Sequence, residues 1–427
     1  MDKFIIKGGN QLKGSVRISG SKNAALPMMA ASLMTQEDVV LKNVPDLRDI
    51  QTMREILDFL GVKVDQVDEH TIRLNAGNLN KNEAPYELVR KMRASICLLG
   101  PLLARTGSAR ISMPGGCVIG PRPVDLHLKG IKYLGVNVNI SHGYIEADGA
   151  LKGSDDVFLG GRFGSSVTAT ANVMMAACMA EGTTYIESAA QEPEIISLAE
   201  MLNLMGAEIE GAGSHVLKIK GVKSLKGCEV EVIPDRIETG TFLMAVAAAG
   251  GDVTIKNARS RHLRAVIDKL QEAGVSLKLG QDQIDVHFNG RLRSVDVITL
   301  PFPGFPTDLQ AQMMAMMNVA DGLSVITEKV YPERFIHISE LNRMGADIKL
   351  EGPTAIIKSV SKLSGASVMA SDLRASAGLV IAGLIAEGET QIYRVYHIDR
   401  GYENIEKKLA VLGADIQRAK EEEGTGY

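Results

Sequence analysis

The sequence predicts an α/β protein of two domains, each built from three βαβαββ repeats with buried helices and outer sheets, an inside-out α/β barrel. Two observations lead to this prediction. Apolar helices alternate along the chain with helices that carry a charged face. A glycine followed by a small apolar residue closes a helical stretch six times, at intervals of 68 to 74 residues, at Gly61, Gly135, Gly206, Gly274, Gly345 and Gly413.

One repeat shows the expected order of elements. Its sequence predicts a strand, a helix, a strand, a second helix and two short strands, at residues 229–233, 237–249, 252–255, 262–273, 275–278 and 283–287. The closing glycine suits the left-handed backbone position after a helix, which only glycine adopts without strain.

The first helix of each repeat is apolar nearly all round, which predicts burial on every side. Such stretches occupy residues 24–33, 173–180, 242–249, 313–317 and 377–385. The second helices, such as residues 51–60 and 402–412, have a charged face and should meet solvent on it.

The sixth repeat stops after residues 415–417, before its last strand. The missing pattern occurs at the start of the chain, in residues 4–8 and 12–14. We therefore expect the N-terminal strand to complete the second domain. The predicted domains are residues 21–232, and residues 1–20 together with 233–427.

Composition excludes several functions. A net charge of −4, 4% aromatic residues and no tryptophan argue against a nucleic-acid surface. We find neither a signal-peptide pattern nor an apolar run long enough to span a membrane. The four cysteines lack metal-ligand spacing and fit a reducing cytoplasm.

Polar residues stand at the predicted helix starts. They are Lys22, Arg93, Ser165, Arg236, Asp308 and Arg374 for the first helices, and Arg122, Glu192, Arg264, Arg334 and Arg400 for the second. Because helix N-termini favour anions, repeated cations there predict a phosphate or carboxylate ligand. Two alternatives stay open: Arg264 and Arg236 could form internal salt bridges, and Thr307-Asp308 could be an ordinary N-cap pair.

One loop, residues 114–123, holds three glycines, three prolines, Cys117 and Arg122. Such a loop cannot continue a helix or a central strand. A thiol beside a cation suits cysteine chemistry, because the positive charge tunes its pKa. The alternative is an incidental cysteine in a Gly-Pro loop.

Together these segments resemble the UDP-N-acetylglucosamine 1-carboxyvinyltransferases, a family of enolpyruvyl transferases. The resemblance covers essentially the whole chain. It rests on residues 21–27, 114–126, 234–240, 305–308, 372–376 and 397–402.

The resemblance implies transfer of enolpyruvyl from phosphoenolpyruvate to the 3′-hydroxyl of UDP-N-acetylglucosamine, with loss of phosphate, at the start of bacterial peptidoglycan synthesis. It implies that Cys117 is the general acid, able to form a covalent adduct and to react with fosfomycin, and that Asp308 is the base. Phosphoenolpyruvate would be held by Lys22, Asn23, Arg122, Arg334, Arg374 and Arg400. The nucleotide sugar would be held by Asn23, Arg93, Arg122, Pro123, Val124, Asp125, Leu126, Gly164, Asp308 and Val330.

The resemblance implies no metal or organic cofactor, and we expect a monomer or weak oligomer in the bacterial cytoplasm. One stretch departs from the pattern: many relatives have Ser-Val-Gly where this chain has Arg162-Phe163-Gly164. Two alternative functions are a shikimate 3-phosphate enolpyruvyl transferase and a non-catalytic paralogue that binds the nucleotide sugar.

Overall fold

The computed structural model describes residues 1–114 and 124–421. The chain forms two compact units, each with its own hydrophobic core. The Lys22 unit comprises residues 20–114 and 124–233 of the described chain, and the Asp308 unit comprises residues 1–19 and 234–421.

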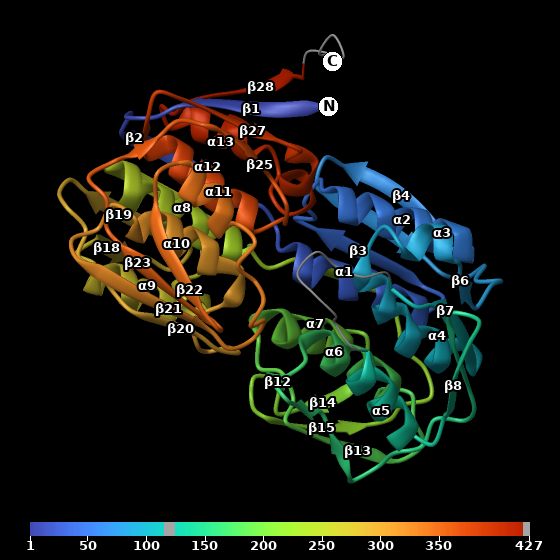
Figure 1. Ribbon diagram of the computed structural model, residues 1–427. Coiled ribbons are helices and arrows are strands. Elements are labelled where there is room, and N and C mark those ends of the chain that lie inside the picture. The colour runs from blue at the N-terminus through green and yellow to red at the C-terminus, as the bar shows by residue number, and fades with distance from the viewer. Residues whose placement is uncertain (115–123, 422–427) are drawn as a thin grey trace. The chain divides into compact units, whose positions relative to one another are not determined.

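The Lys22 unit alternates helices with short strands (Figure 1). Its helices are α1 (Lys22–Ala31), α2 (Arg48–Leu60), α3 (Tyr86–Val89), α4 (Leu99–Thr106), α5 (Asp125–Tyr133), α6 (Val167–Ala177) and α7 (Pro193–Leu204), with 3₁₀ helices η1 (Ser32–Met34) and η2 (Arg93–Leu98). Its strands are β3 (Asp38–Lys42), β4 (Lys63–Asp68), β5 (Thr71–Asn75), β6 (Glu83–Ala84), β7 (Ser108–Ser112), β8 (Asn137–Ser141), β9 (Tyr144–Asp148), β10 (Val157–Phe158), β11 (Gly160–Gly161), β12 (Gly164–Ser165), β13 (Thr183–Glu187), β14 (Glu208–Glu210), β15 (Val216–Lys220) and β16 (Cys228–Glu231).

The Asp308 unit repeats this alternation. Its helices are α8 (Arg236–Ala249), α9 (Arg264–Glu272), α10 (Gln310–Met317), α11 (Ile338–Arg343), α12 (Ala375–Ile385) and α13 (Ile405–Val411), with 3₁₀ helices η3 (Ser260–His262), η4 (Thr307–Leu309) and η5 (Val395–Arg400). Its strands are β1 (Asp2–Lys7), β2 (Leu12–Arg17), β17 (Gly251–Lys256), β18 (Ser276–Leu279), β19 (Gln283–Phe288), β20 (Val297–Thr299), β21 (Leu323–Glu328), β22 (Asp347–Glu351), β23 (Thr354–Lys358), β24 (Leu363–Ser364), β25 (Ser367–Met369), β26 (Ala386–Glu387), β27 (Glu389–Tyr393) and β28 (Asp415–Lys420).

The sheets show the internal repetition. The Lys22 unit has four-stranded sheets of order β16-β3-β5-β4, β6-β7-β9-β8 and β10-β13-β15-β14. The Asp308 unit has β18-β19-β17-β2, β20-β21-β23-β22 and β25-β27-β1-β28. In all six sheets one strand pair is parallel and the other pairs are antiparallel.

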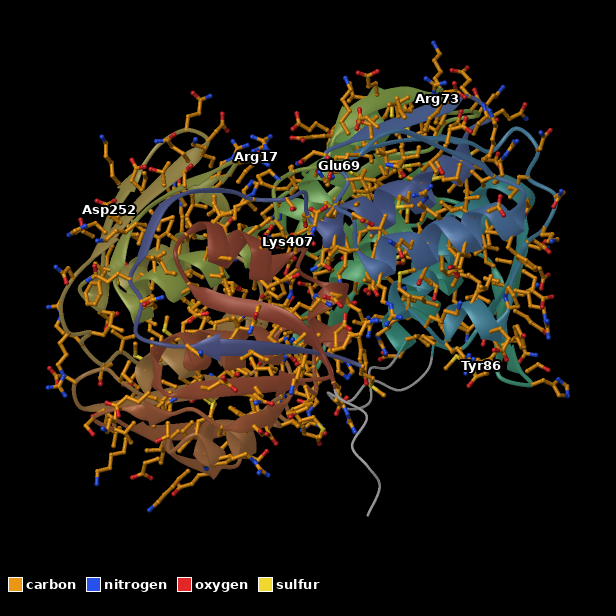
Figure 2. The ribbon with its side chains drawn as sticks, turned by 90° about the horizontal axis from the view of Figure 1, so that it is seen from above. Arg17, Glu69, Arg73, Tyr86, Asp252 and Lys407 are labelled. Atoms are coloured by element: carbon orange, nitrogen blue, oxygen red, sulfur yellow. The ribbon has the colours of Figure 1, made fainter. Side chains whose placement is uncertain are left out.

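The apolar helices are buried, as predicted. In the Asp308 unit α8, α10 and α12 pack against one another, and all eight residues of α10 are buried. In the Lys22 unit α6 packs against both α1 and α4. The second helices are amphipathic: α13 buries Ile405 and Leu409, whereas Lys407 is exposed (Figure 2). This confirms the two helix types.

The six helix-closing glycines have φ between 80° and 103°, at Gly61, Gly135, Gly206, Gly274, Gly345 and Gly413. An L-residue with a side chain would be strained in this left-handed region. The C-terminal helix signal that defined the repeats is therefore confirmed at every position.

Strand β1 lies between β27 and β28, antiparallel to both (Figure 1). Its residues Phe4 and Ile6 are fully buried in the core of the Asp308 unit. The N-terminal strand thus supplies the position that β15 and β23 occupy in their own sheets, and the prediction that it completes the C-terminal part is confirmed.

The strand predicted at the start of the fourth repeat is present, but it does not join the sheet of that repeat. Strand β16, which overlaps the predicted residues 229–233, pairs in parallel with β3 and belongs to the Lys22 unit. Strand β2 takes the corresponding place beside β17 in the Asp308 unit. Alternating hydrophobicity identifies a strand but does not identify its partner, because strand pairing is non-local.

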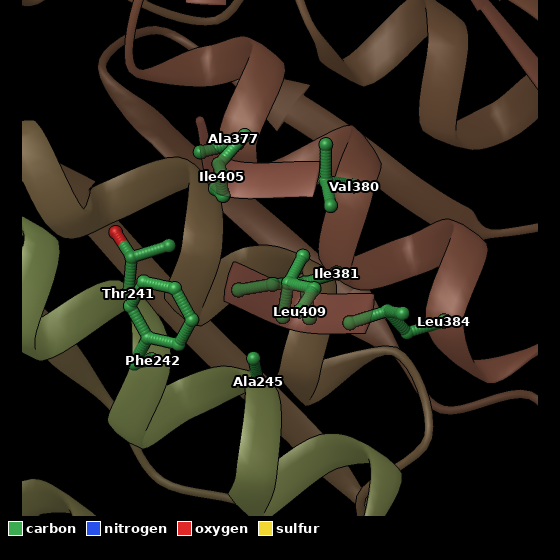
Figure 3. Close-up of a pocket in the computed structure, with 9 residues that line it drawn as sticks. All are labelled: Thr241, Phe242, Ala245, Ala377, Val380, Ile381, Leu384, Ile405 and Leu409. Atoms are coloured by element: carbon green, nitrogen blue, oxygen red, sulfur yellow. The ribbon is translucent and has the colours of Figure 1, made fainter. Parts of the chain in front are cut away.

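A small gap in the core of the Asp308 unit is lined by apolar side chains of α8, α12 and α13 (Figure 3). Its one polar lining residue, Thr241, already donates its hydroxyl to the Ile237 carbonyl, 2.9 Å away. The gap is therefore part of the core packing and offers a polar substrate nothing to bind. Across the described residues, the helices are too short or too polar to cross a membrane.

Candidate active site

Arg334 and its two carboxylate partners are the centre of a buried ion-pair network in the Asp308 unit. Arg334 Nη1 donates to Asp308 Oδ1 at 2.7 Å, and Arg334 Nε donates to Asp372 Oδ2 at 3.3 Å. The Arg334 side chain is only 6% exposed, so its charge depends on these partners. Burial alone would lower the pKa of Arg334, but Asp372 and Asp308 outweigh it and raise that pKa.

Asp372 also orients Arg374. The Asp372 carboxylate accepts the backbone N–H of Arg374 at 3.0 Å. Burial would raise the pKa of Asp372, yet the Arg334 guanidinium and this N–H hold it below its usual range. Asp372 therefore stays ionised and accepts hydrogen bonds from the Arg334 side chain and the Arg374 backbone.

Arg374 stands at the N-cap of α12 and is almost fully buried. Its guanidinium donates to Asp235 Oδ2 at 3.4 Å and to the Gly401 carbonyl at 3.1 Å. It lies 4.8 Å from the centre of the Tyr402 ring, a cation–π contact. Asp235 at the start of α8 and Gly401 beyond η5 thus fix Arg374 from two sides.

The N-cap interpretation of Thr307-Asp308 is wrong. Pro306 is the N-cap of η4, and no side chain caps this helix. Thr307 Oγ1 donates to Glu328 Oε2 at 2.9 Å, and Asp308 accepts from Arg334. Both side chains therefore form tertiary contacts, because the fold brings Arg334 and Glu328, which are distant in sequence, beside them.

Two more expected residues lie in the Asp308 unit. Val330 is half-buried, and its N–H donates to Glu328 Oε1 at 2.8 Å. Arg400 is the last residue of η5 and is half-buried. Its neighbour Asp399 is held by Arg418 of β28 through a bidentate ion pair.

In the Lys22 unit, Lys22 is the first residue of α1 and is buried. Its Nζ donates to Asp49 Oδ2 of α2 at 2.9 Å. Asn23, the next residue, is half-buried. A buried lysine at a helix N-terminus is unfavourable by itself, and Asp49 compensates it.

The start of α5 carries Val124, Asp125 and Leu126, and a buried histidine, His127, follows them. Asn172 Nδ2 lies 3.0 Å from His127 Nδ1, and Thr168 Oγ1 lies 3.1 Å from His127 Nε2. Burial, assisted by the charge of Arg93, lowers the pKa of His127 to about 3. The neutral ring therefore links the start of α5 to α6.

Arg93 begins η2 and is half-buried. Gly164 lies in the short hairpin of β11 and β12, three residues before α6, with φ of 100°. In the divergent stretch beside it, Arg162 packs over the Phe163 ring at 5.2 Å, and both side chains are exposed. The predicted residues Cys117, Arg122 and Pro123 lie outside the described residues.

The cations at the helix starts are better compensated than the sequence suggested. Within the described chain, Lys22, Arg334 and Arg374 have resident carboxylate partners, so their charges are compensated within the fold, and a phosphate or carboxylate ligand for them stays a prediction. Arg264 is exposed, and the structure shows no salt bridge between it and another described residue that would support the salt-bridge alternative.

Sequence reasoning missed the carboxylates that hold these cations, namely Asp49, Asp235 and Asp372. It also missed the buried His127 and Glu328, which bind neighbouring polar groups. Asp235 and Asp372 stand one and two residues before Arg236 and Arg374, inside segments that supported the resemblance. Their ion-pair partners, however, are Arg374 for Asp235 and Arg334 for Asp372, so this proximity does not predict the pairs. Asp49 and Glu328 likewise have no sequence signal for their contacts, since only the fold brings them to their partners.

His337 gives a test of this buried environment. Burial lowers its pKa from 6.5 to about 4, with Asp372 and Arg334 nearby acting in opposite directions. Both ring nitrogens are buried and have no hydrogen-bond partner among residues 1–114 and 124–421. Below pH 6.5 the unfolded chain binds a proton that the folded chain does not, so stability falls as pH falls towards 4.

We expect His337→Leu to remove this loss of stability at acid pH. At pH 5 it amounts to about 2 kcal/mol relative to pH 8, from the depressed pKa. Urea unfolding at both pH values should show a smaller acid loss in the variant than in the parent protein. His215→Leu, at an exposed histidine, is the control, and equal pH dependence in all three proteins would contradict the expectation.

Comparison with known proteins identifies the family. A family model described as EPSP synthase (3-phosphoshikimate 1-carboxyvinyltransferase) matches residues 6–409, nearly the whole chain. The chain belongs to the EPSP synthase family. It is therefore a transferase, and the resemblance to enolpyruvyl transferases is confirmed.

Within this family, curated relatives carry a more specific name. Proteins of Desulfosudis oleivorans and Methylacidiphilum infernorum, both named UDP-N-acetylglucosamine 1-carboxyvinyltransferase, are each 53% identical over 98% of this chain and 99% of their own. Among solved structures, the enolpyruvyl transferase NikO from Streptomyces tendae has a TM-score of 0.88 at 25% identity, covering 98% of this chain and 99% of its own. An EPSP synthase from Acinetobacter baumannii, 18% identical, covers 98% of this chain and all of its own with a TM-score of 0.75, and shares the mixed α/β fold.

Proposed function

We propose that this family member transfers the enolpyruvyl group of phosphoenolpyruvate to the 3′-hydroxyl of UDP-N-acetylglucosamine, releasing phosphate. The observation that carries the proposal is 53% identity along nearly the whole chain to relatives of that name. The buried network supports it, since the Asp308 carboxylate is held by Arg334 at 2.7 Å. This reaction would begin peptidoglycan synthesis in a bacterial cytoplasm.

The chemistry is an addition followed by an elimination. A general acid protonates the methylene carbon of phosphoenolpyruvate, and the sugar oxygen bonds to the neighbouring carbon while its proton passes to a base. Loss of a methyl proton and of phosphate from this tetrahedral intermediate gives the enol ether. Cys117 is the proposed acid and site of covalent capture, and Asp308 is the proposed base.

The remaining charges serve to hold phosphoenolpyruvate. Lys22, Arg122 and Arg400 bind its phosphate in this proposal, while Arg334 and Arg374 bind its carboxylate with Asn23 assisting. Resident carboxylates hold Arg334 and Arg374 in place before substrate arrives, so little reorganisation is needed. The nucleotide sugar would contact Asn23, Arg93, Arg122 to Leu126, Gly164, Asp308 and Val330.

The same proposal extends to the architecture. Each unit would be an inside-out barrel of three repeats, in which the buried helices are enclosed by three sheets. The two units would correspond to domains at residues 21–232, and at residues 1–20 with 233–427. The substrates are small molecules, no organic cofactor is involved, and the protein would be a monomer or weak oligomer.

Phosphate release from phosphoenolpyruvate tests the proposal. We expect release that requires UDP-N-acetylglucosamine and does not occur with shikimate 3-phosphate. Release only with shikimate 3-phosphate would instead assign the sister activity. Tight binding of the nucleotide sugar without any release would indicate a non-catalytic paralogue.

A further inference from the structure

Glu328 is a buried carboxylate with an unusual concentration of hydrogen bonds. It ends β21 and has no exposed surface. Its Oε1 accepts from the Thr299 hydroxyl at 2.6 Å and from the N–H groups of Val330 and Tyr331 at 2.8 and 2.9 Å. Its Oε2 accepts from the Thr307 hydroxyl at 2.9 Å. Four donors thus converge on one side chain that belongs to no assigned substrate contact.

The hydrogen bonds of Glu328 hold the two chain segments that carry Asp308 and Arg334. Thr307 is the chain neighbour of Asp308. On the other side, the carbonyl of Tyr331 accepts the backbone N–H of Arg334 at 2.9 Å. Glu328 therefore anchors the segment that carries the carboxylate and the loop that carries the guanidinium.

The direction of the Thr307 hydroxyl gives Glu328 a more specific effect. Because Thr307 Oγ1 is the donor to Glu328 Oε2, the single hydroxyl proton of Thr307 points at Glu328. The lone pairs of Thr307 then face Arg334 Nη1, which donates to them at 3.2 Å. The same Nη1 donates to Asp308 at 2.7 Å. One hydrogen-bond chain runs from Glu328 through Thr307 and Arg334 to Asp308.

We propose that Glu328 is a positioning residue, which orients Arg334 through Thr307 and thereby holds the Asp308 carboxylate in place. The inference rests on the proposed function in that Asp308 is the base. Glu328 touches no reacting atom in this scheme. Its effect should appear in the rate of turnover and in its pH dependence.

A glutamine at position 328 distinguishes two effects of Glu328: orienting Arg334 through Thr307, and anchoring the loop that carries Arg334. In Glu328→Gln the amide oxygen can keep the three Oε1 contacts, so the loop stays anchored. The amide nitrogen then faces Thr307, whose hydroxyl must turn to accept and loses its own acceptor. We expect an unfolding temperature and a KM for UDP-N-acetylglucosamine near those of the parent protein, a kcat about tenfold lower, and an acid limb of the kcat profile moved to higher pH.

Thr307 supplies the matched variants. Thr307→Val should reproduce the lower kcat and the displaced acid limb, and Thr307→Ser should restore both. The double variant Glu328→Gln with Thr307→Val should be no slower than either single variant, because both break one chain. Glu340→Gln, at a half-buried glutamate that accepts the Met369 N–H, is the control and should leave both quantities unchanged.

The inference would be overturned if the pH profile of kcat were unchanged in Glu328→Gln. It would also be overturned if the fall in kcat were fully explained by a lower unfolding temperature of the variant. If the parent protein released no phosphate at all, the proposed function would fail separately. Crystal structures of the parent protein and Glu328→Gln would then decide: the inference requires the Asp308–Arg334 contact to lengthen in the variant, and an unchanged contact refutes it.

Discussion

Replacing Asp308 with asparagine is expected to lower kcat by about 10²- to 10⁴-fold, the contribution of a general base. The amide cannot take the proton of the sugar hydroxyl. The fold should survive, because Arg334 keeps its second carboxylate partner, Asp372, at 3.3 Å. The loss should therefore appear in turnover with the unfolding temperature close to that of the parent protein.

Initial rates of phosphate release over a range of UDP-N-acetylglucosamine concentrations measure this effect. Asp321→Asn is the matched control, since Asp321 forms an exposed ion pair with Arg291 at 2.7 Å and is not among the proposed site residues. Exposed pairs contribute little, so this variant should behave like the parent protein. A kcat for Asp308→Asn within a few-fold of the control would refute the base assignment.

The repeat architecture was predictable because its signals are local. A helix-closing glycine and an apolar or amphipathic helix each leave a pattern within about a dozen residues. Strand β1 was also assigned correctly, since its sequence matches the strand that the last repeat lacks. Strands β2 and β16 show the limit of this approach: a sequence pattern does not identify the partner of a strand, and only the pairing of β2 with β17 and of β16 with β3 shows which sheet each one joins.

The sequence predicted which charged residues belong to the candidate site, but it did not predict which residues they contact. The positions of Lys22, Arg334 and Arg374 follow from the repeats, but the carboxylates that hold them come from other elements. Thr307-Asp308 shows why this matters. A threonine followed by an aspartate before a helix fits an N-cap, and only the approach of Arg334 and Glu328 shows that both side chains are used elsewhere.

Replacing Cys117 with serine is expected to lower kcat at least about 100-fold, because a serine hydroxyl is far too weak an acid near neutral pH. Cys117→Asp should keep part of the activity, since a carboxyl group can still deliver a proton. It should also escape alkylation by an epoxide such as fosfomycin, because it has no thiol. Phosphate release and intact-protein mass spectrometry measure the two properties.

The other cysteines make this test specific. Burial raises the pKa of Cys97 and Cys178 to about 12 and that of half-buried Cys228 to about 11. Their thiolate fractions near neutral pH are negligible, and the thiolate is the reactive form. A single adduct is therefore expected on the native protein, absent in both Cys117 variants and retained in the control Cys228→Ser. Full activity of Cys117→Ser would exclude the thiol as proton donor, whereas loss of activity with an adduct still forming would place the reactive thiol elsewhere.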